Sequence, residues 1–147
     1  EHTVTINVSD HDGNAAATYT FKFKVDTVPP TLTITAPTNN LITNKKALTL
    51  TGKTNDATSS PVIVTATLNG KSIGAITVGT DGAFTKAITA TEGSNTLVVT
   101  AKDSAGKATT VTVTFKVDTS VPVVKSATIT PNPVNASASV QIVLEIE

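Results

Sequence analysis

Oxygen-bearing side chains gather around Gly13 near the start of the chain, in the segment DHDGN. Asp10, Asp12 and Asn14 stand at alternate positions, a spacing by which loops converge oxygens on Ca²⁺, an ion that takes about six to eight oxygen ligands. The alternative is a polar hairpin turn in which Asp10 bonds its own backbone and Gly13 takes a positive φ. Few of the required oxygens are local, so the turn is the preferred interpretation and calcium stays an alternative.

The inventory of catalytic residue types is poor. His2 and His11 are the only histidines, and neither has a Cys or His partner at zinc-ligand spacing. There is no cysteine nucleophile and no G-x-S-x-G elbow. Carboxylate pairs could hydrolyse glycosides, but sugar-cleaving sites use stacking aromatics, and aromatic residues make up only 3% of the chain. We predict that the chain is not an enzyme.

Composition excludes several partners and indicates strands. The formal net charge is zero and the basic residues are scattered, so binding to nucleic acid or to an anionic membrane is not predicted. No apolar run is long enough to span or insert into a membrane. Threonine makes up about a fifth of the chain, and together with Val and Ile it gives a β-branched composition that suits half-buried strands.

Period-2 alternation predicts strands throughout. A hairpin with one buried face is expected over residues 1–28, and another strand pair at 123–130 and 140–146, joined through a turn at Pro131-Asn132-Pro133. Between them, Asn69-Gly70 is a strong hairpin signal, because both residues tolerate positive φ. Seven strands are predicted in this middle part, at 31–36, 47–54, 62–69, 72–78, 83–89, 95–102 and 108–117.

The chain also matches itself at an offset of about 92–93 residues. The segment KVDT at 24–27 recurs at 116–119, and the D..G pattern at 10–13 recurs at 103–106. This offset predicts a tandem array. We interpret 1–28 as the last two strands of one unit, 29–120 as a complete unit, and 121–147 as the first strands of a third. The units are divided by Val28-Pro29-Pro30 and Val121-Pro122, where proline ends the strands.

The ordered segments VDTVPPTLTI, LTGKTND, ATLNGKSI, GTDGAFTKAI and EGSNTLVVTAKDSAGKATTVTVTFKVDT run through residues 25–119. This set resembles the bacterial immunoglobulin-like domains of surface proteins and secreted hydrolases, in particular the type represented by domain B of glucodextranase. The resemblance implies an all-β immunoglobulin-like Greek-key β-sandwich and a spacer, stalk or adhesion role at the bacterial cell surface or in the extracellular medium. It implies no catalytic residues.

Two aspartates precede the proline linkers, Asp26 and Asp118. In some bacterial immunoglobulin-like arrays such junctional acids bind calcium and stiffen the rod, so the resemblance makes them candidate calcium ligands. The alternative is a capped strand end, which is preferred because one carboxylate alone is a poor calcium site. Asp56 could join either arrangement. The turn at Asp103-Ser104-Ala105-Gly106-Lys107 keeps only the aspartate and glycine of the first loop.

The sequence therefore favours a non-catalytic structural spacer or stalk module of a bacterial surface or secreted protein, either adhesin-like or accessory to an extracellular enzyme. Its partners would be neighbouring immunoglobulin-like domains, and its cofactors none, or calcium. One alternative is self-association into a filament, because incomplete terminal units would expose unpaired strand edges. Another is binding of a glycan or a host protein. The carbohydrate version is disfavoured because Tyr19 and the phenylalanines fall on predicted core faces.

Overall fold

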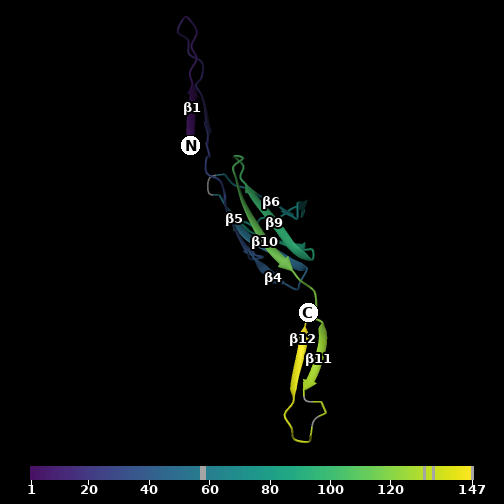
Figure 1. The fold of residues 1–147 in the computed structure, drawn as a ribbon. Coiled ribbons are helices and arrows are strands. Elements are labelled where there is room, and N and C mark those ends of the chain that lie inside the picture. Colours follow the sequence, from purple (N-terminus) through teal and green to yellow (C-terminus); the bar gives the residue numbers. More distant parts are fainter. Residues whose placement is uncertain (57–58, 131, 134, 147) are drawn as a thin grey trace.

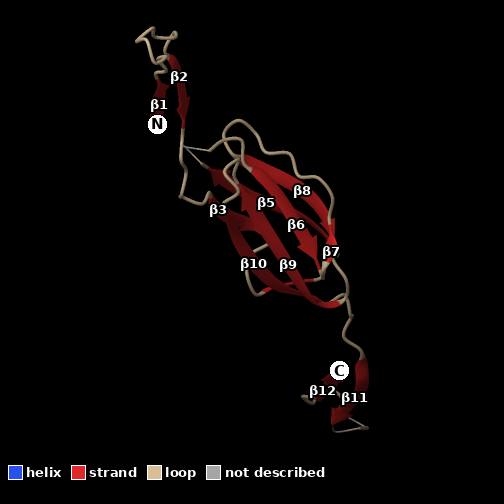
Figure 2. Cartoon of the chain, turned by 90° about the horizontal axis from the view of Figure 1, so that it is seen from above, coloured by secondary structure: helices blue, strands red, loops and turns tan. Residues whose placement is uncertain are grey.

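The protein is all-β. The computed structural model describes residues 1–147 except 57, 58, 131, 134 and 147, so the predicted turn residue Pro131 lies outside the described residues. The described part contains no helix long and apolar enough to cross a bilayer. The described residues form twelve strands, and Figures 1 and 2 show them as a central sandwich with a hairpin at either end.

The central sandwich consists of two sheets. The smaller sheet has the order β3-β5-β8, with β3 at Thr31–Ala36, β5 at Ala47–Asn55 and β8 at Ala83–Thr89. The larger sheet has the order β4-β10-β9-β6-β7, with β4 at Leu41–Thr43, β6 at Ile63–Leu68, β7 at Lys71–Ser72, β9 at Gly93–Lys102 and β10 at Ala108–Val117. All pairings are antiparallel except β4 with β10. The connections β3–β4, β4–β5, β5–β6, β7–β8 and β8–β9 cross between the sheets, as expected for a Greek-key sandwich.

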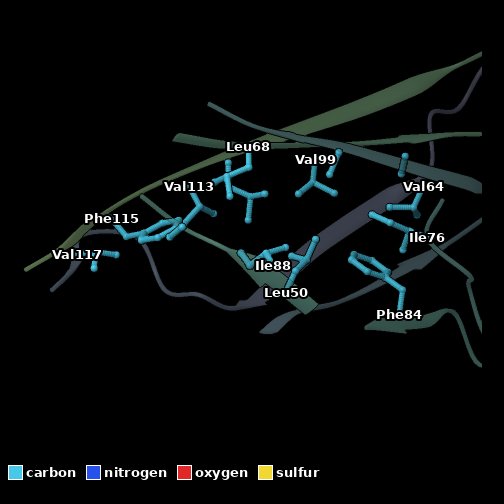
Figure 3. Packing of buried hydrophobic residues seen from close by; sticks show 14 residues of the cluster. Leu50, Val64, Leu68, Ile76, Phe84, Ile88, Val99, Val113, Phe115 and Val117 are labelled. Carbon is cyan, nitrogen blue, oxygen red and sulfur yellow. The ribbon is translucent and has the colours of Figure 1, made fainter. Parts of the chain in front are cut away.

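Alternate residues of both sheets fill the space between them. Leu97 and Val99 of β9 are fully buried and face Leu50 of β5 and Phe84 of β8 across the core. Figure 3 shows Val99 on the opposite side of the core from Leu50 and Phe84, with Phe115 and Val117 at one end. Because the pattern of buried and exposed residues has the period of a strand, the core follows directly from the sequence.

Two details of the sandwich differ from the sequence prediction. The strand expected at 72–78 is reduced to Lys71–Ser72, because Gly74 takes a positive φ and the chain then crosses from one sheet to the other. It does so through isolated bridges from Ile76 to Val64 and from Val78 to Phe84. The short strand β4 was not predicted, because three residues are too few for alternation to register.

Within the described residues, each terminal strand pairs only with the other strand of its own hairpin. β1 (His2–Ile6) pairs with β2 (Tyr19–Phe23), and β11 (Val124–Thr130) pairs with β12 (Gln141–Ile146). The prediction of one buried face is wrong for the first hairpin in this chain, since both of its faces are exposed. Its apolar residues have the alternation of a core face, but among the described residues no second sheet packs against them.

The packing makes a direct prediction. Leu97→Ala should lower the free energy of unfolding by about 2–5 kcal/mol, because it removes a buried side chain and leaves a cavity between the sheets. Chemical denaturation followed by circular dichroism measures this loss. Ile63→Ala is the matched control, because Ile63 is 65% exposed and its truncation should change stability by less than about 0.5 kcal/mol. Equal losses for the two variants would contradict the described core.

Candidate metal centre

Three aspartates meet at the end of the sandwich where the chain enters it. Asp26 lies in the linker after β2, Asp56 directly follows β5, and Asp103 begins the turn between β9 and β10. Each offers one carboxylate oxygen, and these three oxygens all lie within 4.8 Å of one another. We call this group the acid cluster.

The topology brings these three segments together. β3 runs antiparallel to β5, so that Thr31, the first residue of β3, lies opposite Asn55, the last residue of β5. The hydroxyl of Thr109, at the start of β10, donates a hydrogen bond of 2.6 Å to the carbonyl of Pro30 in the linker. The start of β3, the end of β5 and the β9–β10 turn therefore share one end of the sandwich.

Hydrogen bonds hold one oxygen of each carboxylate in the acid cluster. Asp103 is only 5% exposed, and its Oδ1 accepts a bond of 2.8 Å from the amide of Lys107. Asp26 Oδ1 accepts one of 3.0 Å from the amide of Val28. The Oδ2 atoms of both residues are buried and receive no hydrogen bond within the described part of the chain. Asp56 Oδ1 accepts a bond of 2.9 Å from Ser59.

The electrostatics of this arrangement favour a cation. Two carboxylates about 5 Å apart repel each other by about 3 kcal/mol at an effective dielectric constant of about 20. A buried oxygen without a donor costs roughly a further 1–3 kcal/mol. In the described chain, neither Asp26 nor Asp103 forms an ion pair with a lysine or histidine. A divalent cation among the three oxygens would replace repulsion by attraction.

The residues singled out in the first loop form a closed turn. Asp10 Oδ1 accepts a bond of 2.8 Å from the amide of Asn14, and Asp10 Oδ2 accepts one of 2.9 Å from its side-chain Nδ2. These bonds from Asn14 hold the pKa of Asp10 below its ordinary value. Gly13 has a φ of 88°, and Asp12 is exposed. The structure thus brings Asp10 and Asn14 together as turn partners.

Asp118 is placed differently from Asp26, although both follow the same KVDT pattern. Its Oδ1 accepts a bond of 3.1 Å from the amide of Ser120, and Lys116 Nζ lies 3.4 Å from its Oδ2. The bond from Ser120 and, after it, the charge of Lys116 lower the pKa of Asp118. Asp118 is not a member of the acid cluster.

Glu92 is a residue with a structural role that the sequence pattern does not single out. Its Oε1 accepts a bond of 2.9 Å from the amide of Thr119, and its Oε2 one of 2.7 Å from the hydroxyl of the same residue. Lys46 Nζ lies 3.4 Å from Oε2. Glu92 therefore fastens the start of the second linker to the sandwich. The bonds from Thr119 lower the pKa of Glu92.

Asp103 was noticed only as the counterpart of Asp10, and its place in the acid cluster was missed. The signal lay in the strand order. Which linker lies beside the β9–β10 turn can be predicted only once the pairing of the strands is known. The three aspartates are visible in the sequence, but their spacing does not show that they share one end of the sandwich.

The fold agrees with the match of this chain to a family of known proteins. The family model described as glucodextranase, domain B matches residues 30–119, which is more than half of the chain. The chain belongs to the glucodextranase domain B family. No curated protein matches it.

The glucodextranase domain B fold is shared with solved modules of other proteins. The fibronectin(III)-like modules of Clostridium thermocellum CbhA superpose with a TM-score of 0.54 at 24% identity, over 78% of this chain and 60% of that one. At this identity the likeness shows the fold alone, an immunoglobulin- or fibronectin(III)-like arrangement. An engineered protein solved at 1.98 Å has a TM-score of 0.44 at 19% identity, over 60% of this chain and 20% of that one.

The Glu92 bonds predict a pH-dependent loss of stability. Because the pKa of Glu92 is lowered on folding, its contribution is present above the ordinary value of 4.5 and disappears as the pH falls through the lowered pKa. Glu92→Gln should therefore melt below the unchanged protein at pH 7, and the difference should shrink as the pH falls below 4.5 and vanish once it is below the lowered pKa of Glu92. Asp12→Asn is the matched control, because it also neutralises one exposed acidic side chain but lies outside residues 30–119 and away from this contact. Identical melting of Glu92→Gln and the unchanged protein at every pH would show that this contact contributes nothing.

Proposed function

We propose that this chain is a non-catalytic spacer module of an extracellular bacterial protein, accessory to an enzyme or to an adhesive surface domain. One observation carries the proposal. The first hairpin joins the sandwich at one end, and the second leaves it at the opposite end, as both Figure 1 and Figure 2 show. A module connected in this way adds its full length to the distance between its neighbours.

Both linkers are held against the sandwich, which supports limited bending. At the N-terminal junction Thr109 bonds the carbonyl of Pro30, and the buried hydroxyl of Thr54 donates a bond of 2.6 Å to the carbonyl of Thr31. At the other junction Glu92 holds Thr119, and the amide of Asp118 donates a bond of 2.9 Å to the carbonyl of Thr43. Proline restricts both linkers further.

Membership in the glucodextranase domain B family supports an accessory role in an extracellular protein. The residue inventory agrees with such a role, since both histidines lie outside the matched residues 30–119 and the chain has no cysteine. The sequence offset of about 92–93 residues supports neighbouring immunoglobulin-like units as the partners of the module. A cell-wall or adhesive location rests on the sequence resemblance alone.

Glycan or host-protein binding has weaker support. Phe84 and Phe115 are buried in the core and present no ring to a ligand. Tyr19, Phe21 and Phe23 are 42–66% exposed, but they occupy the face of the first hairpin that corresponds to the buried face of β10. Their exposure is therefore better explained by a missing second sheet than by a sugar platform.

Small-angle X-ray scattering tests the spacer directly. A compact domain of this length has a radius of gyration of about 15 Å, and an unfolded chain about 40 Å. The proposal predicts a value clearly between these limits, with the profile of an extended folded particle. A value of about 15 Å would mean that the hairpins fold back on the sandwich, and the spacer proposal would then be wrong.

A second candidate, self-association, is favoured by the two hairpin faces. Val4, Phe21 and Phe23 share one face of the first hairpin, and Leu144 and Ile142 share one face of the second. By sequence offset the first face corresponds to the β9–β10 half of a sandwich and the second to the β3–β5 half. Two molecules could therefore pack these faces together and build a head-to-tail filament.

Size-exclusion chromatography with light scattering decides between the two candidates. A filament predicts a mass that rises with concentration and falls to that of a monomer in Phe21→Lys. Thr20→Lys is the matched control, because Thr20 lies on the opposite face of the same strand and should leave assembly unchanged. A monomer at all concentrations would exclude the filament and leave the spacer.

A further inference from the structure

We propose that the acid cluster of Asp26, Asp56 and Asp103 is a calcium site that locks the N-terminal linker onto the sandwich. The inference concerns the ion and the junction, and it holds whether or not the module acts as a spacer. It rests on the buried geometry of the cluster and on a comparison between similar turns within the same chain.

The first argument is the burial of Asp103. Its side chain is more than nine-tenths buried, and one of its oxygens is already used by the amide of Lys107. The other oxygen, Oδ2, is buried and receives no hydrogen bond from the described residues. Asp103 is also the most buried member of the acid cluster. A buried carboxylate oxygen needs a donor or a cation. Asp26 Oδ2, from the linker, is in the same state.

The second argument is an internal comparison. Asp10 and Asp103 both accept a bond from the amide four residues later, and Asp26 and Asp118 both accept one from the amide two residues later. In the exposed members of these pairs the second oxygen is also used, by Asn14 at Asp10 and by Lys116 at Asp118. Among the described residues, these turns leave the second oxygen without a hydrogen bond at Asp26 and Asp103, the two members that belong to the acid cluster.

The third argument is the size of the site. Calcium binds oxygens at 2.3–2.6 Å, so two ligand oxygens of one calcium ion can be at most about 4.6–5.2 Å apart. All three oxygens lie within 4.8 Å of one another, a spacing that one calcium ion can span. Magnesium demands near-ideal octahedral geometry and gives up its water ligands reluctantly, so a set of protein carboxylates favours calcium. Three carboxylates without nitrogen or sulfur ligands also favour calcium over zinc or copper.

The ligands come from three separate segments, and this gives the ion a mechanical consequence. Asp26 belongs to the linker, whereas Asp56 and Asp103 belong to the sandwich. An ion shared among them ties the preceding unit to the sandwich at a second point, besides the bond between Thr109 and Pro30. The N-terminal junction would then be stiff with calcium and looser without it, while the junction held by Glu92 would not respond.

Isothermal titration of the chelator-treated chain with CaCl₂ tests the site. We expect about one calcium ion per chain, weaker binding of MgCl₂, and a higher melting temperature in calcium than in EGTA, because the ion binds only the folded state. Asp103→Asn keeps the acceptor for Lys107 but removes the charge, and should weaken calcium binding at least tenfold. Asp26→Asn should do the same without changing a buried turn.

Asp118→Asn and Asp10→Asn are the matched controls, because each changes the same kind of turn outside the cluster. Both should bind calcium like the unchanged chain. Loss of binding in Asp10→Asn but not in Asp103→Asn would place the ion in the first loop and overturn the proposal, as would no binding heat and no calcium-dependent melting. Circular dichroism of each variant separates loss of the site from loss of the fold. If the chain binds no calcium, the calcium proposal is wrong, but the scattering test of the spacer proposal keeps its expected result.

Discussion

Face-to-face packing of two strand layers is the constraint on which the rest of the structure depends. Leu50, Leu97 and Val99 lose all contact with water only when both sheets are present. The chain has no cysteine, so no disulfide supports this packing. The same packing fixes which turns and linkers share an end of the sandwich, and so decides where charged side chains meet.

The two junctions of the sandwich use different chemistry. At the C-terminal junction, both oxygens of Glu92 are bonded by Thr119, and Lys46 balances the charge. At the N-terminal junction, three carboxylates converge and two of them keep a buried oxygen that receives no hydrogen bond from the described residues. The first junction is bonded within the chain, whereas the second is the one at which we propose an ion. Under that proposal only the N-terminal junction would respond to calcium.

The sequence was informative where period-2 alternation is long and regular. It predicted β3, β8 and β10 with their observed bounds, and it placed the Asn69-Gly70 turn, whose residues both have positive φ. It failed at β7, where one glycine redirects the chain between sheets, and at the exposed first hairpin. Alternation tells which side chains share a face, but it does not tell whether another sheet covers that face.

The candidate site was only partly accessible from sequence for a related reason. Asp26 was identified as a junctional acid and Asp56 as a residue that could join it, but Asp103 was interpreted as a turn residue. These three residues are separated by 30 and 47 positions along the chain. Only the pairing of β3 with β5 and of β9 with β10 brings them within 4.8 Å. Metal sites assembled from distant turns leave no spacing pattern to find.

A crystal structure determined in the presence of calcium tests the central claim most directly. The account predicts a peak of calcium density within about 2.3–2.6 Å of carboxylate oxygens from Asp26, Asp56 and Asp103. A structure that instead shows a lysine, a backbone amide or only water against Asp103 Oδ2, at a saturating calcium concentration, would contradict it.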